Sequence, residues 1–267
     1  MLVASGKGGV GKSTIVASLG VGLTRMTFRV CIIDADIGLR DQDAILGLEN
    51  RIVYDVVDVC NKACSLEQAL VSPIETPGLK LLPAAQIARC KDMDQKAFRR
   101  VLHELKETND FVLIDCPAGI ERGLRGVLSA EVDETVIVCT ADDVCIRNAE
   151  RVCDLLTKRE LPRPQLIVNR LMPELIEAGE MYAAQVVAET LDLALLGEVP
   201  EDPTVYRALL RHISPMTLDC PGQEALTRIA RRISGQTVPL PRYGTAKRGW
   251  LERLLHRRVK EVKRLDR

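Results

Sequence analysis

Residues 1–14 read Met-Leu-Val-Ala-Ser-Gly-Lys-Gly-Gly-Val-Gly-Lys-Ser-Thr, a short apolar run followed by a glycine-rich stretch. Gly6, Gly11, Lys12 and Ser13 satisfy the pattern GxxxxGK[ST], in which the glycines allow several backbone N–H groups to turn toward one point. A helical pattern begins near Lys12, so the positive end of a helix dipole should face the same point. This stretch therefore predicts a strand, a phosphate-binding loop and a helix in direct succession.

The loop pattern also predicts roles for its side chains. We expect Lys12 to neutralise the β- and γ-phosphates of a nucleotide and the Ser13 hydroxyl to ligate Mg²⁺. The alternative, a glycine-rich turn before a helix, is disfavoured by the strand that precedes the loop and the amphipathic helix that follows it. The nucleotide-binding residues expected from the loop are Gly6, Lys7, Gly8, Gly9, Val10, Gly11, Lys12, Ser13 and Thr14.

Lys7 places a second cation inside the loop. Because like charges repel, this cation is unexpected unless it meets phosphate charge beyond that of one bound nucleotide. A solvated loop lysine is the other interpretation, and the residues alone leave both open.

Short apolar runs alternate with longer helical patterns along the rest of the chain. This alternation predicts an α/β fold with a mostly parallel central sheet and helices on both faces, and with ligands at the carboxyl ends of the strands. The expected strands are 2–5, 29–34, 79–83, 111–115, 134–140, 165–169 and 194–199, and the expected helices are 12–26, 95–108, 147–159, 183–191, 204–211 and 222–234.

Composition and charge limit the function classes. Only 3% of residues are aromatic, which argues against base-stacking RNA modules. The formal net charge is zero, yet residues 242–267 contain ten Lys/Arg and three Asp/Glu, which leaves an acidic body with a basic tail. Such a tail indicates an anionic partner at that end of the chain.

The chain has nine cysteines and no CxxC pair. We interpret them as reduced, buried thiols of a cytosolic protein, with a metal site at Cys60 and Cys64 as the alternative. No signal peptide is visible, and no apolar run approaches the roughly 20 residues of a spanning helix. We therefore expect a cytoplasmic protein whose membrane contact, if present, is peripheral.

Several of these segments resemble one known family. Lys7-Gly-Gly-Val-Gly-Lys-Ser13 is similar to the deviant Walker A motif of the MinD/ParA family of P-loop NTPases. Asp-Ala-Asp-Ile-Gly-Leu-Arg-Asp at 34–41, Leu-Gly-Leu-Glu-Asn-Arg-Ile-Val-Tyr-Asp-Val at 46–56 and Asp-Cys-Pro-Ala-Gly-Ile-Glu at 115–121 narrow the resemblance to the branch that determines septum sites. The similarity extends from residue 1 to the tail.

The resemblance implies ATP and Mg²⁺ as cofactors and assigns further roles. Lys7 is expected to reach the nucleotide of a partner subunit in an ATP-bound homodimer, and Asp36 is expected to position the attacking water. Lys7, Lys12 and Asp36 are thus the expected catalytic residues, and Ser13, Asp34 and Asp115 the expected metal residues. The alternative for the three aspartates is that they end strands or cap helices.

The base-binding segments rest on the resemblance as well. Asn169-Arg170 at a strand end and Pro200-Glu201-Asp202 look like the adenine-pocket segments of the family. Without the resemblance, Asn169 would be interpreted as a turn former. The family also leads us to expect a first strand longer than residues 2–5, and hence a natural start upstream of Met1.

The basic tail has helical periodicity. We divide the chain into an ATPase domain at 1–234, a linker at 235–248 and an amphipathic helix at 249–267. This helix is expected to lie on anionic phospholipid, as the resemblance also implies. A helix docked on the domain's own core or on another protein is the alternative. The expected membrane-binding residues are Trp250, Leu251, Leu254, Leu255, Arg253, Arg257 and Arg258.

The resulting prediction is a membrane-associated ATPase that dimerises on ATP and positions the division septum from the cytoplasmic face of the cell membrane. The resemblance implies a MinC-like division inhibitor and a MinE-like activator, or another topological factor, as partners. A flagellar-number regulator shares the fold and tail, although segments 46–58 and 115–121 favour the septum branch. A ParA-type partition ATPase needs a basic body, so we expect no nucleic acid partner. A metal-cluster carrier needs a CxxC pair, which is missing.

Overall fold

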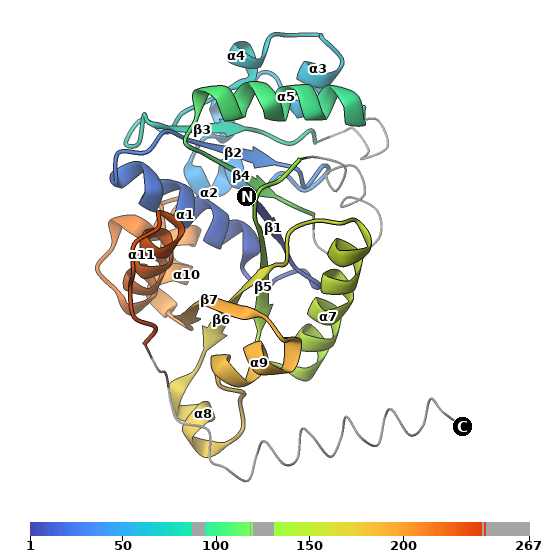
Figure 1. The fold of residues 1–267 in the computed structure, drawn as a ribbon. Helices are drawn as coiled ribbons and strands as arrows, with labels where there is room; N and C mark the ends of the chain where they lie inside the picture. Colours follow the sequence, from blue (N-terminus) through green and yellow to red (C-terminus); the bar gives the residue numbers. More distant parts are fainter. Residues whose placement is uncertain (87–93, 118, 120–130, 242, 244–267) are drawn as a thin grey trace.

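The computed structural model describes residues 1–86, 94–117, 119, 131–241 and 243. Within these residues, seven strands form one sheet in the order β3-β2-β4-β1-β5-β6-β7, and every strand pair in it is parallel (Figure 1). The predicted parallel sheet is thus confirmed. The strands are β1 (Leu2–Ala4), β2 (Val30–Asp34), β3 (Leu79–Leu82), β4 (Phe111–Asp115), β5 (Thr135–Thr140), β6 (Gln165–Leu171) and β7 (Ala194–Pro200).

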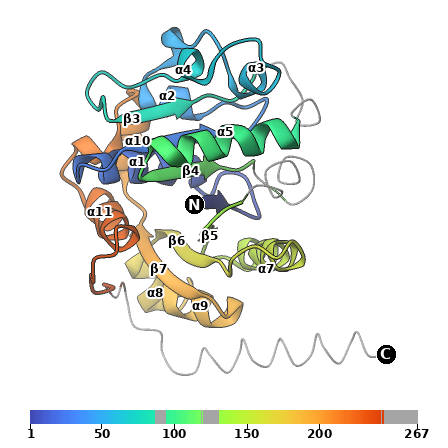
Figure 2. The same ribbon diagram turned by 45° about the horizontal axis from the view of Figure 1, so that its top comes forward.

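Helices cover both faces of this sheet, as predicted. In Figure 1, α1 and α11 lie on one face, and α5, α7 and α9 lie on the other; Figure 2 shows the same layers from a second direction. The described helices are α1 (Lys12–Arg25), α2 (Gln42–Leu46), α3 (Val56–Cys60), α4 (Leu66–Ala69), α5 (Gln95–Thr108), α7 (Asp143–Lys158), α8 (Pro173–Ala178), α9 (Ala184–Leu191), α10 (Pro203–Leu210) and α11 (Pro221–Ile233), with 3-10 turns at Glu49–Arg51 and Pro215–Thr217.

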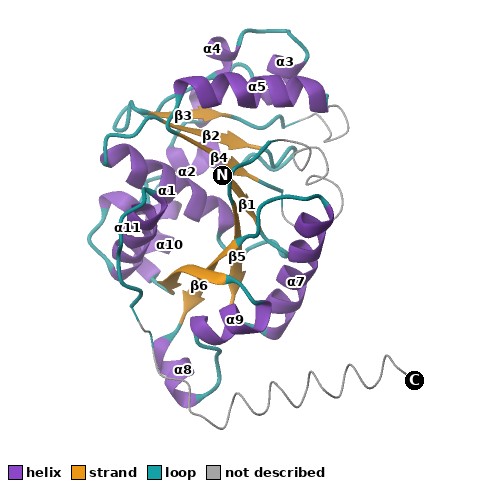
Figure 3. Cartoon of the chain, in the orientation of Figure 1, coloured by secondary structure: helices purple, strands orange, loops and turns teal. Residues whose placement is uncertain are grey.

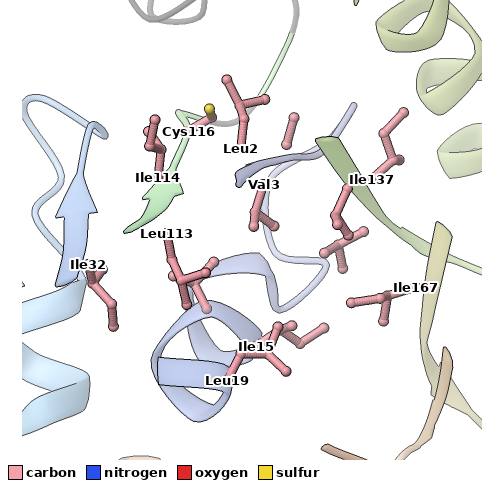
Figure 4. Close-up of a cluster of buried hydrophobic side chains, with 14 of the residues drawn as sticks. Leu2, Val3, Ile15, Leu19, Ile32, Leu113, Ile114, Cys116, Ile137 and Ile167 are labelled. Atoms are coloured by element: carbon pink, nitrogen blue, oxygen red, sulfur yellow. The ribbon is translucent and has the colours of Figure 1, made fainter. Parts of the chain in front are cut away.

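The core lies where α1 crosses the centre of the sheet. Ile15 and Leu19 of α1 lie near Val3 of β1 and Leu113 of β4, and all four side chains are buried (Figure 4). Close approach of α1 also depends on Gly20, because a Cβ there would lie 2.7 Å from the Ile32 side chain. The near-continuous apolar strands are explained by this arrangement, in which both faces of the sheet are covered.

Local differences from the predicted elements have local causes. Helix α7 begins at Asp143, before the predicted residue 147, because the Asp142 side chain caps it by accepting from the Cys145 N–H. Four short helices, α2, α3, α4 and α8, were not predicted, since runs of four to six residues show little periodicity (Figure 3). Helices α3 and α4 begin with capping boxes, formed by Asp55 with Asp58 and by Ser65 with Gln68. Such pairs, three residues apart, are a sequence signal for the start of a helix.

The described part of the predicted linker lies against α11. Arg232 donates from Nε to the Val238 carbonyl at 2.8 Å and from Nη2 to the Pro239 carbonyl at 2.6 Å. The Tyr243 hydroxyl pairs with Arg228 Nη2 at 2.9 Å. Val238, Pro239 and Tyr243 are therefore held against α11.

Candidate functional site

The glycine-rich loop joins β1 to α1 at the carboxyl end of the sheet. Gly9 and Gly11 have φ angles of +79° and +88°, in the left-handed region that favours glycine. Gly11 is also the N-cap residue of α1, and a Cβ there would lie 2.4 Å from the side-chain nitrogen of Asn169. The backbone conformation thus favours glycine at this position, as the motif predicts, and an added Cβ would displace the Asn169 amide.

A pocket of about 470 Å³ opens beside this loop. Its walls include the loop residues Lys7–Ile15, Asp36 after β2, and the predicted base segments 169–170 and 200–202. The fold thus brings together phosphate-loop and base-pocket residues that lie far apart in the sequence. Its apolar lining from Val205, Tyr206 and Leu209 of α10 was not predicted, because no sequence motif marks these residues.

Lys12 is buried, with 5% of its surface exposed, and its ammonium group forms an ion pair with Asp115. Its Nζ also lies 3.4 Å from Ser13 Oγ. Burial lowers the pKa of Lys12, but the charge and hydrogen bond of Asp115 outweigh burial and raise that pKa overall. Lys12 is therefore a charged, water-shielded cation at the floor of the phosphate site.

Asp34 and Asp115 are direct neighbours in the register of β2 with β4. Asp34 is fully buried and accepts from the N–H of Asp36 at 3.0 Å and from the N–H of Gln42 at 3.2 Å. Burial, followed by the nearby charge of Asp115, raises the pKa of Asp34 to about 8. Asp36 is 8% exposed and lines the pocket. The three predicted acids therefore gather beside Lys12 and Ser13.

Gln42, at the start of α2, belongs to this cluster and was missed by the sequence analysis. Its side-chain Nε2 donates to Asp115 Oδ2 at 2.6 Å and to the Ser13 carbonyl at 3.0 Å. Its Oε1 is buried without a hydrogen-bond partner among the described residues. A lone glutamine at the start of a short helix belongs to no motif, so its place in this cluster becomes evident only in the folded chain.

These side chains fit a magnesium ion. Mg²⁺ prefers oxygen ligands and usually keeps several waters when bound beside substrate phosphates. Ser13, Asp34 and Asp115 present hydroxyl and carboxylate oxygens, and the buried Oε1 of Gln42 adds an acceptor that no described group satisfies.

The predicted base segment contacts the phosphate loop directly. Asn169 Nδ2 donates to the Val10 carbonyl at 2.7 Å, and Arg170 Nη1 donates to the Gly9 carbonyl at 3.2 Å. Arg170 Nε also pairs with Glu201 at 2.9 Å. Asn169 and Arg170 therefore brace the loop as well as line the pocket.

Asp202 also has a structural role. Its carboxylate accepts from the N–H of Thr204 at 2.8 Å, which caps α10, and from the N–H of Gly222 at 2.9 Å. The side chain of Asp202 is thus engaged in joining α10 to α11, while the residue still lines the pocket beside Pro200 and Glu201.

Lys7 is exposed at the mouth of the pocket. Burial raises the pKa of Asp142, but hydrogen bonds from Thr140 and Cys145, together with the charge of Lys7, outweigh burial and lower that pKa overall. The Lys7 side chain therefore lies near the start of α7, at the open side of the phosphate loop.

Other predicted features concern the tail, the cysteines and membrane-spanning helices. The tail residues Trp250, Leu251, Leu254, Leu255, Arg253, Arg257 and Arg258 lie outside the described residues. Within the described part of the chain, the cysteines are free thiols that are buried or half-buried, and none of them belongs to a group of three or more His, Cys, Asp or Glu side chains that could hold a metal ion. Among the same residues, no helix has the length and apolarity needed to span a membrane.

Comparison with known proteins decides the family. The septum site-determining protein MinD of Synechocystis sp. is 39% identical to this chain over 261 residues, which cover 96% of this chain and 97% of that protein. The chain belongs to the MinD family of P-loop ATPases. A ParA family profile, described as NUBPL iron-transfer P-loop NTPase, matches residues 1–234 and agrees with the wider ParA/MinD grouping.

Solved structures of MinD family members have the same fold. The MinC:MinD cell division protein complex of Aquifex aeolicus matches with a TM-score of 0.84 and 37% identity, covering 91% of this chain and 98% of that chain. MinD of Pyrococcus horikoshii, solved in complex with Mg-ADP, matches with a TM-score of 0.76 and 27% identity, covering 87% and 94%. The resemblance to the MinD/ParA family is thus confirmed over nearly the whole chain.

Proposed function

We propose that this chain is a magnesium-dependent ATPase that acts as the nucleotide-controlled switch of septum placement. The observation that supports it best is the single pocket in which the phosphate loop, Asp36 and the base segment meet. Its membership of the MinD family, together with the Mg-ADP bound to the Pyrococcus protein, supports ATP and Mg²⁺ as the ligands.

The residues of the pocket have distinct roles in the proposed phosphoryl transfer. The loop N–H groups and Lys12 hold the phosphates, and Lys12 neutralises charge that develops on the transferred group. Asp36, at the edge of the pocket, orients the attacking water. Ser13 and Asp115, with Asp34 beside them, would hold Mg²⁺, which when bound would further neutralise the phosphate charge.

Nucleotide binding has to compete with the ion pair between Lys12 and Asp115. Phosphate oxygens attract Lys12, and a magnesium ion attracts Asp115, so each partner of the pair gains a new partner of opposite charge. We therefore expect ATP and Mg²⁺ to bind cooperatively, since neither buried charge is then left unpaired.

Phosphate release with the Asp36→Asn variant tests the assignment of the water-orienting residue. Hydrolysis should fall by about 10²–10⁴-fold while ATP binding persists, because only a group that acts on the water is changed. Asp41→Asn is the matched control, since Asp41 lines the same pocket from an exposed position. Hydrolysis by Asp36→Asn at the wild-type rate would refute the assignment.

Dimerisation is proposed from Lys7. This exposed cation at the pocket mouth is placed to meet the phosphates of a nucleotide held by a second copy. Light scattering with ATP should then detect a dimer of the wild-type chain and a monomer of Lys7→Ala. A Lys7→Ala variant that dimerises equally well would contradict this role.

Membrane binding is proposed from the sequence of residues 249–267. One tail is a weak anchor, because only a few apolar side chains are buried at the interface and each basic residue near anionic lipid contributes about 1 kcal/mol. Two tails on one dimer should therefore bind by avidity.

Binding to a MinC-like division inhibitor is proposed from the MinC:MinD complex of Aquifex aeolicus.

Sedimentation with anionic liposomes tests the membrane switch. The full chain should pellet with ATP and remain largely in solution with ADP, and a chain that ends at Arg248 should stay in solution with either nucleotide. Equal pelleting in all of these conditions would rule out a nucleotide-controlled tail.

A further inference from the structure

Gln42 is a fully buried polar residue at the point where the expected metal residues meet. Its side-chain amide contacts Asp115 and the backbone of Ser13, and its backbone N–H contacts Asp34. Among the described residues it is thus a direct hydrogen-bonding link to each of the positions expected to face the metal.

The hydrogen bonds determine how the amide is oriented. Both hydrogens on Nε2 are used, one by the Asp115 carboxylate at 2.6 Å and one by the Ser13 carbonyl at 3.0 Å. The reverse orientation would place the amide oxygen against two acceptors, so it is excluded by electrostatic repulsion. Oε1 is therefore the atom that remains buried and unpartnered.

A buried carbonyl oxygen without a donor is costly, about 1–3 kcal/mol in typical proteins, so its presence calls for a compensating ligand. No described donor pairs with Oε1, and the nearby Lys12 ammonium is already paired with Asp115. The chemistry that suits Oε1 is a donor O–H that enters with the nucleotide, and a magnesium-bound water is such a donor, since Mg²⁺ keeps several of its waters.

We propose that Gln42 is a positioning residue of the magnesium site. Its amide nitrogen holds the Asp115 carboxylate in place, and its carbonyl oxygen accepts a hydrogen bond from the water shell of the ion. This inference rests on the proposed magnesium-dependent ATPase function and adds a residue to it. It also ties α2 to the metal, because Gln42 is the first residue of that helix.

The test is the affinity of the full-length chain for ADP, measured by calorimetry in excess EDTA and in saturating Mg²⁺. The ratio of the two dissociation constants is the magnesium enhancement, which does not depend on hydrolysis. Gln42→Met has a similar volume but no amide, and it should reduce the enhancement by about 10–100-fold, the usual effect of losing an outer-shell partner. Affinity in EDTA should stay at the wild-type value.

Gln42→Leu is the second variant. It also lacks the amide, so the magnesium enhancement should fall by a similar factor. Gln185→Met, at an exposed position of α9, is the matched control and should leave the enhancement unchanged.

The measured enhancements distinguish a metal-positioning role of Gln42 from a purely structural role. An unchanged enhancement in Gln42→Met, even with a lower melting temperature, would show a purely structural role and overturn the proposal. If Gln42→Met does not fold, a wild-type enhancement in Gln42→Leu would overturn it. An absence of magnesium enhancement in the wild type would instead refute the proposed magnesium-dependent function.

Discussion

Glu198 is a buried carboxyl in β7, with 6% of its surface exposed. Burial raises its pKa to about 7, although the N–H of Tyr243 and the charges of Arg228 and Arg232 act in the opposite direction. These groups come from α11 and from the segment that lies against it. Replacement of Glu198 by Gln removes the titration and retains an oxygen that accepts from the Tyr243 N–H.

The expected magnitude follows from proton linkage. A carboxyl with a higher pKa in the folded state stabilises the fold below its unfolded pKa of 4.5, and this contribution is lost as the pH rises through about 7. At about 1.4 kcal/mol per pKa unit, the loss between about pH 5 and about pH 8.5 is about 2.5 kcal/mol. The stability of the wild type relative to Glu198→Gln should therefore fall by that amount over this range.

Urea denaturation of the nucleotide-free chain, followed by circular dichroism, measures this difference. Tryptophan fluorescence is unsuitable, because the single tryptophan, Trp250, lies in the tail. Glu177→Gln at an exposed position of α8 is the matched control and should parallel the wild type. If Glu198→Gln also parallels the wild type at every pH, the buried carboxyl does not titrate as described and the reasoning is wrong.

Three further predictions concern the loop and α5. Gly11→Ala should abolish ADP binding, measured by calorimetry, and should lower the melting temperature, because the added Cβ would lie against the Asn169 side chain. Gly235→Ala is the control, since Gly235 also has a positive φ but has open space around it. An equal effect of the two changes would exclude the clash with Asn169 as the cause. Leu105→Ala removes a fully buried side chain and should cost about 2–5 kcal/mol in urea denaturation, so a loss below that range would show that the core collapses around it. Asp94→Ala removes the cap of α5 and should cost about 1 kcal/mol by the same measurement, and no loss would mean that water replaces the cap.

Local sequence patterns were sufficient to predict the phosphate loop and most of the helices and strands. The phosphate loop is a short local segment, Gly6–Thr14, so its backbone conformation and its place before α1 follow from residues that are neighbours in the sequence. The apolar strands and amphipathic helices were predictable for the same reason, because their periodicity reflects the faces that each buries. The short helices escaped prediction, since α2 and α8 contain too few residues for a period to show.

The assembled site depended on contacts between distant parts of the chain. Sheet order places β4 between β2 and β1, and this order sets Asp34 beside Asp115 and in reach of Lys12. No periodicity encodes which strands pair, because pairing is decided by the combined packing of every helix and strand. Gln42 shows the consequence most clearly. A glutamine at this position in the sequence does not by itself indicate a functional role. The role follows only because the fold buries Gln42 against carboxylates from β2 and β4.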